Sequence, residues 1–150
     1  MLGILTRRAM QSRAVGWEAG RLPFRPVLAW LGMLGLCAAY LQGGLDKLFG
    51  PAAAIAETAA LHVPMPALAT AATVVTELAG SLMVLAGWHR RLGALWLAAF
   101  TAVANMLANA WWSVPAGPLR TAMENGFFEH IGLIGGFVLI VIQGSSVRNR

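Results

Sequence analysis

One carboxylate lies in the middle of a long apolar stretch of the sequence. Glu77 is the only charged residue in the segment 66–87. A charge at the centre of a bilayer costs on the order of 3 kcal/mol, so such residues face the interior of a helical bundle and by default indicate a functional site. Glu77 shares a four-residue spacing with Ala69, Thr73 and Ser81, which a helix places on one face. We expect Glu77 to be an inward-facing acid that carries a proton or binds a ligand. The structural alternative is an acid that holds its helix to the next one through a hydrogen bond to Asn105.

Other polar residues lie toward one end of the remaining apolar stretches. The residues expected to contact a ligand are Tyr40, Gln42, Asp46, Lys47, Asn105, Asn109 and Trp111, and those expected to assist Glu77 in proton transfer are Glu129 and His130. Asn105 and Asn109 are four residues apart, and amides at that spacing also hold helices together. For Lys47 two alternatives stand: a surface ion pair with Asp46, or a reach into the bundle toward Glu77 or Glu129.

The chain offers little chemistry for a bound metal. Cys37 is its one cysteine, which excludes a disulfide framework, a CxxC redox centre and a cysteine-ligated iron–sulfur cluster. His62 and His130 have neither HxxxH nor Cys/His spacing around them. We expect no metal site and no intrinsic cofactor.

The elements that must position these residues are apolar helices. Of the 150 residues, 58% are hydrophobic and 11% charged, which does not suit a surface that faces water. Four runs are long enough to cross a bilayer: residues 27–45, 66–87, 92–112 and 127–143. Their hydrophobicity does not alternate with a period of two, so they are helices and not barrel strands. The predicted fold class is an all-α integral membrane four-helix bundle. A short outer helix is expected over residues 52–61, and an irregular loop over residues 113–126, which contain Pro115, Gly117 and Pro118.

The distribution of basic residues predicts the orientation. With both termini inside, nine of the eleven basic residues are cytoplasmic: Arg7, Arg8, Arg13, Arg21, Arg25, Arg90, Arg91, Arg148 and Arg150. This bias predicts an N-in, C-in topology and, despite a net charge of +5, no nucleic-acid partner. The expected organisation is a basic cytoplasmic segment (residues 1–25) without a cleaved signal peptide, a membrane domain (26–145) and a cytoplasmic tail (146–150). Whether the first segment lies on anionic headgroups or is disordered stays open.

This orientation places most polar side chains in the outer half of the bundle. We therefore predict a polar cavity that is floored near Glu77 and opens to the outer face. Runs of small residues at four-residue spacing predict close helix packing: Gly35, Ala39 and Gly43; Ala72, Thr76 and Gly80; Gly132 and Gly136.

Several segments together resemble the DoxX family. They are GGLDKLF (residues 43–49), VPMP (63–66), TELAG (76–80), LAGWHRR (85–91) and FFEHIGLIGG (127–136). The likeness extends from residue 27 to about residue 144. Glu77 and the Asp46-Lys47 pair match recurring polar positions of the family. The fourth helix departs from it, because Glu129-His130 stands where many relatives carry a Lys-Asn pair, which puts an anion-binding role in doubt.

The resemblance implies a small, multi-pass protein of the bacterial cytoplasmic membrane. Members of the wider group are similar to membrane subunits of thiosulfate:quinone oxidoreductase and of a terminal quinol oxidase complex. On this basis the chain is expected to bind a quinone and to work with a soluble or membrane redox partner that supplies the electron carrier. It could also form a homo-oligomer. The alternatives are a non-enzymatic scaffold or assembly factor and, less well supported, a carrier that uses Glu77 as a protonation switch.

Overall fold

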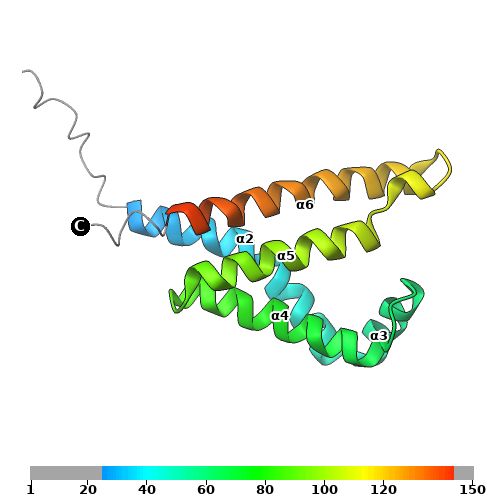
Figure 1. Cartoon of the computed structure of the whole chain (residues 1–150), viewed down its shortest axis with the longest axis horizontal. Helices are drawn as coiled ribbons and strands as arrows, with labels where there is room; N and C mark the ends of the chain where they lie inside the picture. Colours follow the sequence, from blue (N-terminus) through cyan, green and yellow to red (C-terminus); the bar gives the residue numbers. More distant parts are fainter. Residues whose placement is uncertain (1–24, 144–150) are drawn as a thin grey trace, which may run out of the picture. The chain divides into compact units, whose positions relative to one another are not determined.

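A computed structural model describes residues 25–143, and that part of the chain is helical without strands (Figure 1). The elements are α2 (Arg25–Phe49), α3 (Pro51–Ala60), α4 (Pro66–Ala86), α5 (Arg90–Ala108), the 3-10 helix η1 (Trp111–Ser113) and α6 (Pro118–Gln143). The predicted all-α fold class is confirmed. The predictions for the basic N-terminal segment and for the C-terminal tail fall almost entirely outside the described residues.

Four of these helices are long and apolar enough to cross a membrane: α2, α4, α5 together with η1, and α6. At about 1.5 Å per residue even the 21-residue α4 reaches about 30 Å, the thickness of a hydrocarbon core. The chain divides into two compact units after Leu31. In the first, the described residues are the opening turns of α2, whose Val27, Leu28 and Leu31 are exposed. All contacts described below lie in the second unit, from Gly32 onward.

The short outer helix is where the sequence predicts it. Pro51 occupies the first turn of α3, where the missing N–H of proline has no partner to lose, and the helix ends four residues before Pro64. In the connection to α4, His62 and Met65 have left-handed backbone conformations. Figure 1 shows α3 beside the beginning of α4.

The irregular loop predicted for residues 113–126 is wrong over most of its length, because α6 begins at Pro118. Proline suits the first helical turn, and the amide of Thr121 already donates to the carbonyl of Gly117. The loop is limited to residues 114–117. The third span is also interrupted: α5 ends at Ala108, and η1 follows as a separate short turn.

The bundle core is formed by side chains from four helices. Its fully or nearly buried apolar residues are Cys37, Tyr40, Val84, Ala94, Leu97, Ala98 and Phe137. Small residues bring the helices close together. A Cβ atom on Gly80 would lie 2.8 Å from Leu97, and one on Gly136 would lie 2.7 Å from Leu36. The packing role predicted for Gly35 and Gly132 is not seen, because no atom lies within 4 Å of a Cβ built on either.

Candidate functional site

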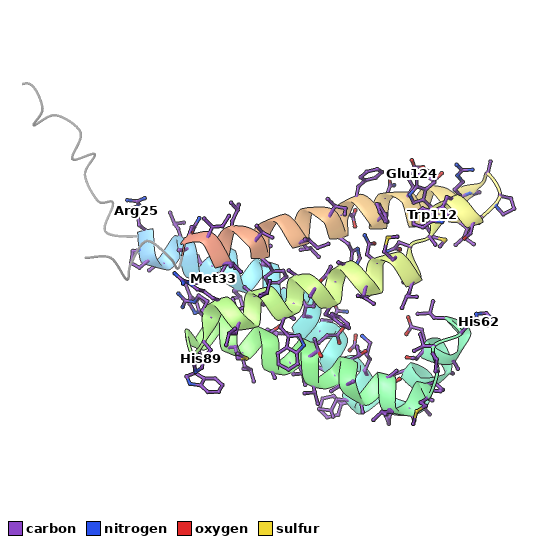
Figure 2. The ribbon with its side chains drawn as sticks, viewed as in Figure 1. Arg25, Met33, His62, His89, Trp112 and Glu124 are labelled. Atoms are coloured by element: carbon purple, nitrogen blue, oxygen red, sulfur yellow. The ribbon has the colours of Figure 1, made fainter. Side chains whose placement is uncertain are left out.

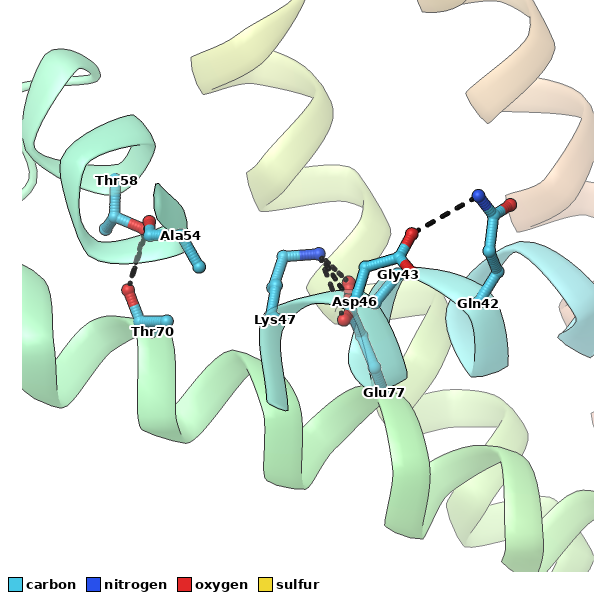
Figure 3. A network of polar contacts seen from close by, with 8 residues as sticks. All are labelled: Gln42, Gly43, Asp46, Lys47, Ala54, Thr58, Thr70 and Glu77. Carbon is cyan, nitrogen blue, oxygen red and sulfur yellow. Dashed lines mark hydrogen bonds and ion pairs between the residues drawn. The ribbon is translucent and has the colours of Figure 1, made fainter. Parts of the chain in front are cut away.

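Lys47 and Glu77 form an ion pair between α2 and α4 (Figure 3). The Lys47 ammonium lies 3.3 Å from Oε1 and 3.2 Å from Oε2 of Glu77. Glu77 is 7% exposed, and the side chain of Lys47 is 27% exposed. Both residues lie in helices long enough to span a membrane, and each compensates the charge of the other.

Two adjacent glycines on α2 make room for this pair. A Cβ atom on Gly44 would lie 2.8 Å from the Leu78 side chain, so only glycine allows α2 and α4 to approach this closely. A Cβ atom on Gly43 would lie 3.1 Å from Nζ of Lys47 and 3.6 Å from Oε2 of Glu77. The GG dipeptide therefore fixes both the distance between the helices and the space around the two charges.

The hydrogen-bonding capacity of the ammonium is fully used. Lys47 donates to both carboxylate oxygens of Glu77 and, at 3.2 Å, to the carbonyl of Gly43, which lies one turn earlier. An ammonium group has three N–H bonds, and three acceptors surround it here. Of the two alternatives for Lys47, the structure shows the reach to Glu77. Asp46 accepts instead from the amide of Gln42 at 3.3 Å.

A pocket of about 260 Å³ lies next to the pair. It is lined by Gly43, Asp46, Lys47, Gly50, Ala53, Ala54 and Glu57, so it occupies the angle between the end of α2 and α3. Lys47 thus connects the pocket to the buried carboxylate. Glu77 is not among the lining residues, and the cavity floored by Glu77 stays a prediction.

Tyr40 reaches the centre of the bundle from the same helix as Lys47. Its hydroxyl lies 2.5 Å from the Thr101 hydroxyl on α5, and Thr101 also donates to the Leu97 carbonyl at 2.6 Å. The Tyr40 ring meets Phe137 of α6 edge to face, with ring centroids 5.4 Å apart. Tyr40 therefore links three helices, and its hydroxyl is already hydrogen-bonded.

Asn105 joins α5 to α6 through a hydrogen bond, and Asn109 is hydrogen-bonded to Asn105. Asn105 is buried and donates from its amide to the carbonyl of Phe127 at 3.1 Å, and Asn109 donates to Asn105 at 2.9 Å. Nδ1 of His130 lies 2.6 Å from the carbonyl of Gly126. Of these contacts, the bond from Asn105 to Phe127 joins α5 to α6, as packing between helices requires, and the His130 contact lies within α6. Within residues 25–143 no hydrogen bond joins Asn105 to Glu77. The predicted bond between them is therefore not seen, and the partner of Glu77 is Lys47 instead.

The remaining predicted residues lie apart from the ion pair. Glu129 is exposed on α6, and no contact in the described part of the chain joins Glu129 or His130 to Lys47 or Glu77. The Trp111 ring lies 5.1 Å from the Arg120 guanidinium and packs against Trp112. Figure 2 shows Trp112 and Glu124 near one another where the chain passes into α6, at the end of the bundle away from His89.

Sequence reasoning missed the contact that holds α3 in place. The hydroxyls of Thr58 and Thr70 lie 2.9 Å apart, and Thr58 also donates to the carbonyl of Ala54 (Figure 3). Thr70 is 4% exposed. The available signal was one threonine on each of two consecutive helices, but nothing in their spacing shows that the helices fold back on each other. Glu57 lines the pocket but was not predicted as a site residue, because single charged residues are common on short surface helices.

Comparison with known proteins relates the chain to a family of membrane proteins. The family model described as DoxX matches residues 24–110. Inner membrane protein YphA of Escherichia coli (strain K12) is 25% identical over 120 residues, which is 80% of this chain and 85% of that protein. A Surfeit locus protein 4 homolog of Drosophila melanogaster is 36% identical over 75 residues, 47% of this chain, and the chain covers only 28% of that relative's length. No solved structure matches. Since the family model covers more than half of a chain whose helices can span a membrane four times, the protein belongs to the DoxX family of membrane proteins.

Proposed function

We propose that the protein is an integral membrane subunit of a quinone-linked oxidoreductase complex in a bacterial cytoplasmic membrane. The observation that carries the proposal is the buried Lys47–Glu77 ion pair beside a pocket. Ionisable groups inside membrane spans are rare and commonly belong to proton relays or ligand sites. The E. coli relative is named as an inner membrane protein, which supports the location.

In this proposal the chain binds the quinone headgroup and exchanges protons, and a partner protein supplies the electrons. Reduction of a quinone to a hydroquinone takes up two protons with two electrons, so the headgroup needs a proton donor nearby. Lys47 faces the pocket and contacts Glu77, so a proton released from the pair can be replaced from water in the pocket. Tyr40, Asn105, Asn109 and Trp111 shape the surrounding bundle, and Gln42 and Asp46 form the polar edge at the end of α2.

A quinone-binding measurement with matched variants tests the proposal. We expect the purified protein to bind a short-chain ubiquinone or menaquinone analogue, and Glu77→Gln to weaken this binding at least tenfold. Glu124→Gln, the same chemical change near the outer end of α6, serves as the control and should have no effect. Equal binding by all three proteins, or no binding by any, contradicts the proposal.

The second candidate is a non-enzymatic scaffold or assembly factor. It is favoured by the saturated hydrogen bonding of Lys47, since a closed ion pair is also a good structural link between α2 and α4. In that case Glu77→Gln lowers the stability in detergent, and any cellular phenotype follows the amount of protein. A Glu77→Gln protein that is present at normal levels but has lost quinone binding rejects the scaffold.

A further inference from the structure

Helix α6 is the least covered of the four potential spans. Only 6% of the residues in its most apolar window are buried, compared with 33% for α4 and for the α5–η1 segment. Its exposed side includes Phe128, Glu129, Gly132, Gly135 and Leu139, a set we call the glycine face of α6. Apolar residues there can simply contact lipid. The glycines and the carboxylate need another explanation.

The two glycines leave backbone uncovered. No atom lies within 4 Å of a Cβ built on Gly132 or on Gly135, whereas a Cβ on neighbouring Gly136 would overlap Leu36 of α2. Small residues in membrane helices commonly allow a second helix to approach closely. At Gly136 the approaching helix is α2 of the same chain. At Gly132 and Gly135 no helix of the described residues approaches.

Glu129 borders the same surface. It lies three residues before Gly132, so the two are neighbours on the helix. It is exposed, and no ion pair or hydrogen bond reaches its side chain from residues 25–143. Gln143 follows 14 positions later, about 21 Å along the helix, so a hydrocarbon core of about 30 Å with one boundary at Gln143 would include Glu129. A carboxylate at that depth calls for a basic partner.

We propose that the glycine face of α6 binds a transmembrane helix of a partner protein, and that this helix carries a lysine or arginine at the depth of Glu129. A second copy of the chain is a poor occupant. A two-fold axis on this face would bring two Glu129 carboxylates together, Lys47 is paired with Glu77, and Arg120 lies over Trp111 near the start of α6. This proposal rests on the proposed function in one respect. The partner protein bound at the glycine face would be the one that supplies the electrons.

Binding of defined peptides tests the charge complementarity directly. The full-length protein, labelled with a fluorescence donor, is reconstituted in phosphatidylcholine vesicles with acceptor-labelled, tryptophan-anchored Leu/Ala transmembrane peptides. One peptide has a single lysine about 9 Å below one interface, and its control has methionine there. We expect the lysine peptide to bind about tenfold more tightly, which corresponds to one favourable interhelical polar contact.

Matched variants locate the binding surface. Glu129→Gln should remove the preference for lysine, Gly132→Leu should weaken both peptides, and Gly35→Leu, at an equally open glycine of α2, should change neither. Equal binding of the two peptides, or a preference that survives Glu129→Gln, overturns the proposal. Energy transfer between two copies of the chain that Gly132→Leu abolishes also overturns it, because the face then belongs to a homo-oligomer. The peptide assay uses neither quinone nor a change at Glu77, so failure of the quinone proposal remains distinguishable.

Discussion

At the scale of single residues, Lys47 and Glu77 stabilise the protein only as long as both are present. Removing an ion from water is costly, and the contact between the two charges compensates that cost only with good geometry. Here three acceptors, the two carboxylate oxygens of Glu77 and the carbonyl of Gly43, lie 3.2–3.3 Å from the ammonium. Loss of Lys47 leaves the buried Glu77 carboxylate without compensation, and loss of Glu77 leaves a partly buried ammonium without its partner.

A double-mutant cycle measures this dependence. We expect Glu77→Gln and Lys47→Met each to lower the free energy of unfolding by about 3 kcal/mol or more, which is typical for breaking a buried pair. The double variant should lose much less than the sum, since no unpaired charge remains. Unfolding monitored by circular dichroism in a mild detergent provides the three values. Additive losses would mean that the pair is hydrated and weakly coupled.

The sequence identifies these residues but not their contact. Glu77 stands out because it is a lone charge in an apolar segment, and that signal is local. The choice between Asp46, Glu77 and Glu129 as the partner of Lys47 depends on how two helices meet across 30 residues of chain. Gly43 and Gly44 determine how the two helices meet. This role cannot be read from the sequence, because it depends on the contact between Gly44 and Leu78.

At the scale of the helices, packing depends on how closely the helix backbones approach each other. Some glycines lie at these points of close approach and others do not. Gly44 faces Leu78, but Gly35, nine residues earlier on the same helix, has no neighbour within 4 Å. Both look alike in the sequence, as small residues in an apolar run. Spacing alone therefore cannot tell a glycine that packs within the chain from one that is left open.

Alanine substitutions at these two positions should have different effects. Gly44→Ala places a Cβ 2.8 Å from Leu78 and should destabilise the protein by about 1–3 kcal/mol, as overpacking does. Gly35→Ala meets no atom and should be neutral or stabilising by up to about 1 kcal/mol through helix propensity. Thermal unfolding of both variants in one detergent checks the difference. Equal effects would show that α2 and α4 are not in close contact.

Helix boundaries show a further limit of sequence reasoning. Pro115, Gly117 and Pro118 predict a loop by composition, but Pro118 begins a 26-residue helix. Proline can end one helix and begin another. It begins a helix where it lies in the first turn, because its missing N–H has no partner to lose there. By contrast, Pro51 correctly predicts the start of a helix, because an alanine-rich run follows it.

For the whole molecule, the two ends of the bundle differ in chemistry. The turn between α4 and α5 carries His89, and α5 begins with Arg90 and Arg91. Figure 2 shows His62, Trp112 and Glu124 away from the His89 end. Arg90 donates to the carbonyl of Val84 at the end of α4 and so holds this turn together. The positive-inside rule predicts that this arginine-rich end of the bundle faces the cytoplasm.

Cysteine labelling tests this orientation, which determines the side from which protons reach Lys47. Cys37 is the only cysteine and is fully buried, so Cys37→Ala provides a background in which every labelled thiol is an introduced one. In that background, Ala116→Cys in the loop before α6 should react with a membrane-impermeant maleimide in cells whose outer membrane is permeable. Trp88→Cys, in the turn before Arg90, should react only after the inner membrane is opened, because an odd number of spans separates the two positions. The reverse pattern would contradict the predicted orientation and place the pocket at the end of α2 on the cytoplasmic side, so that protons would reach Lys47 from the cytoplasm.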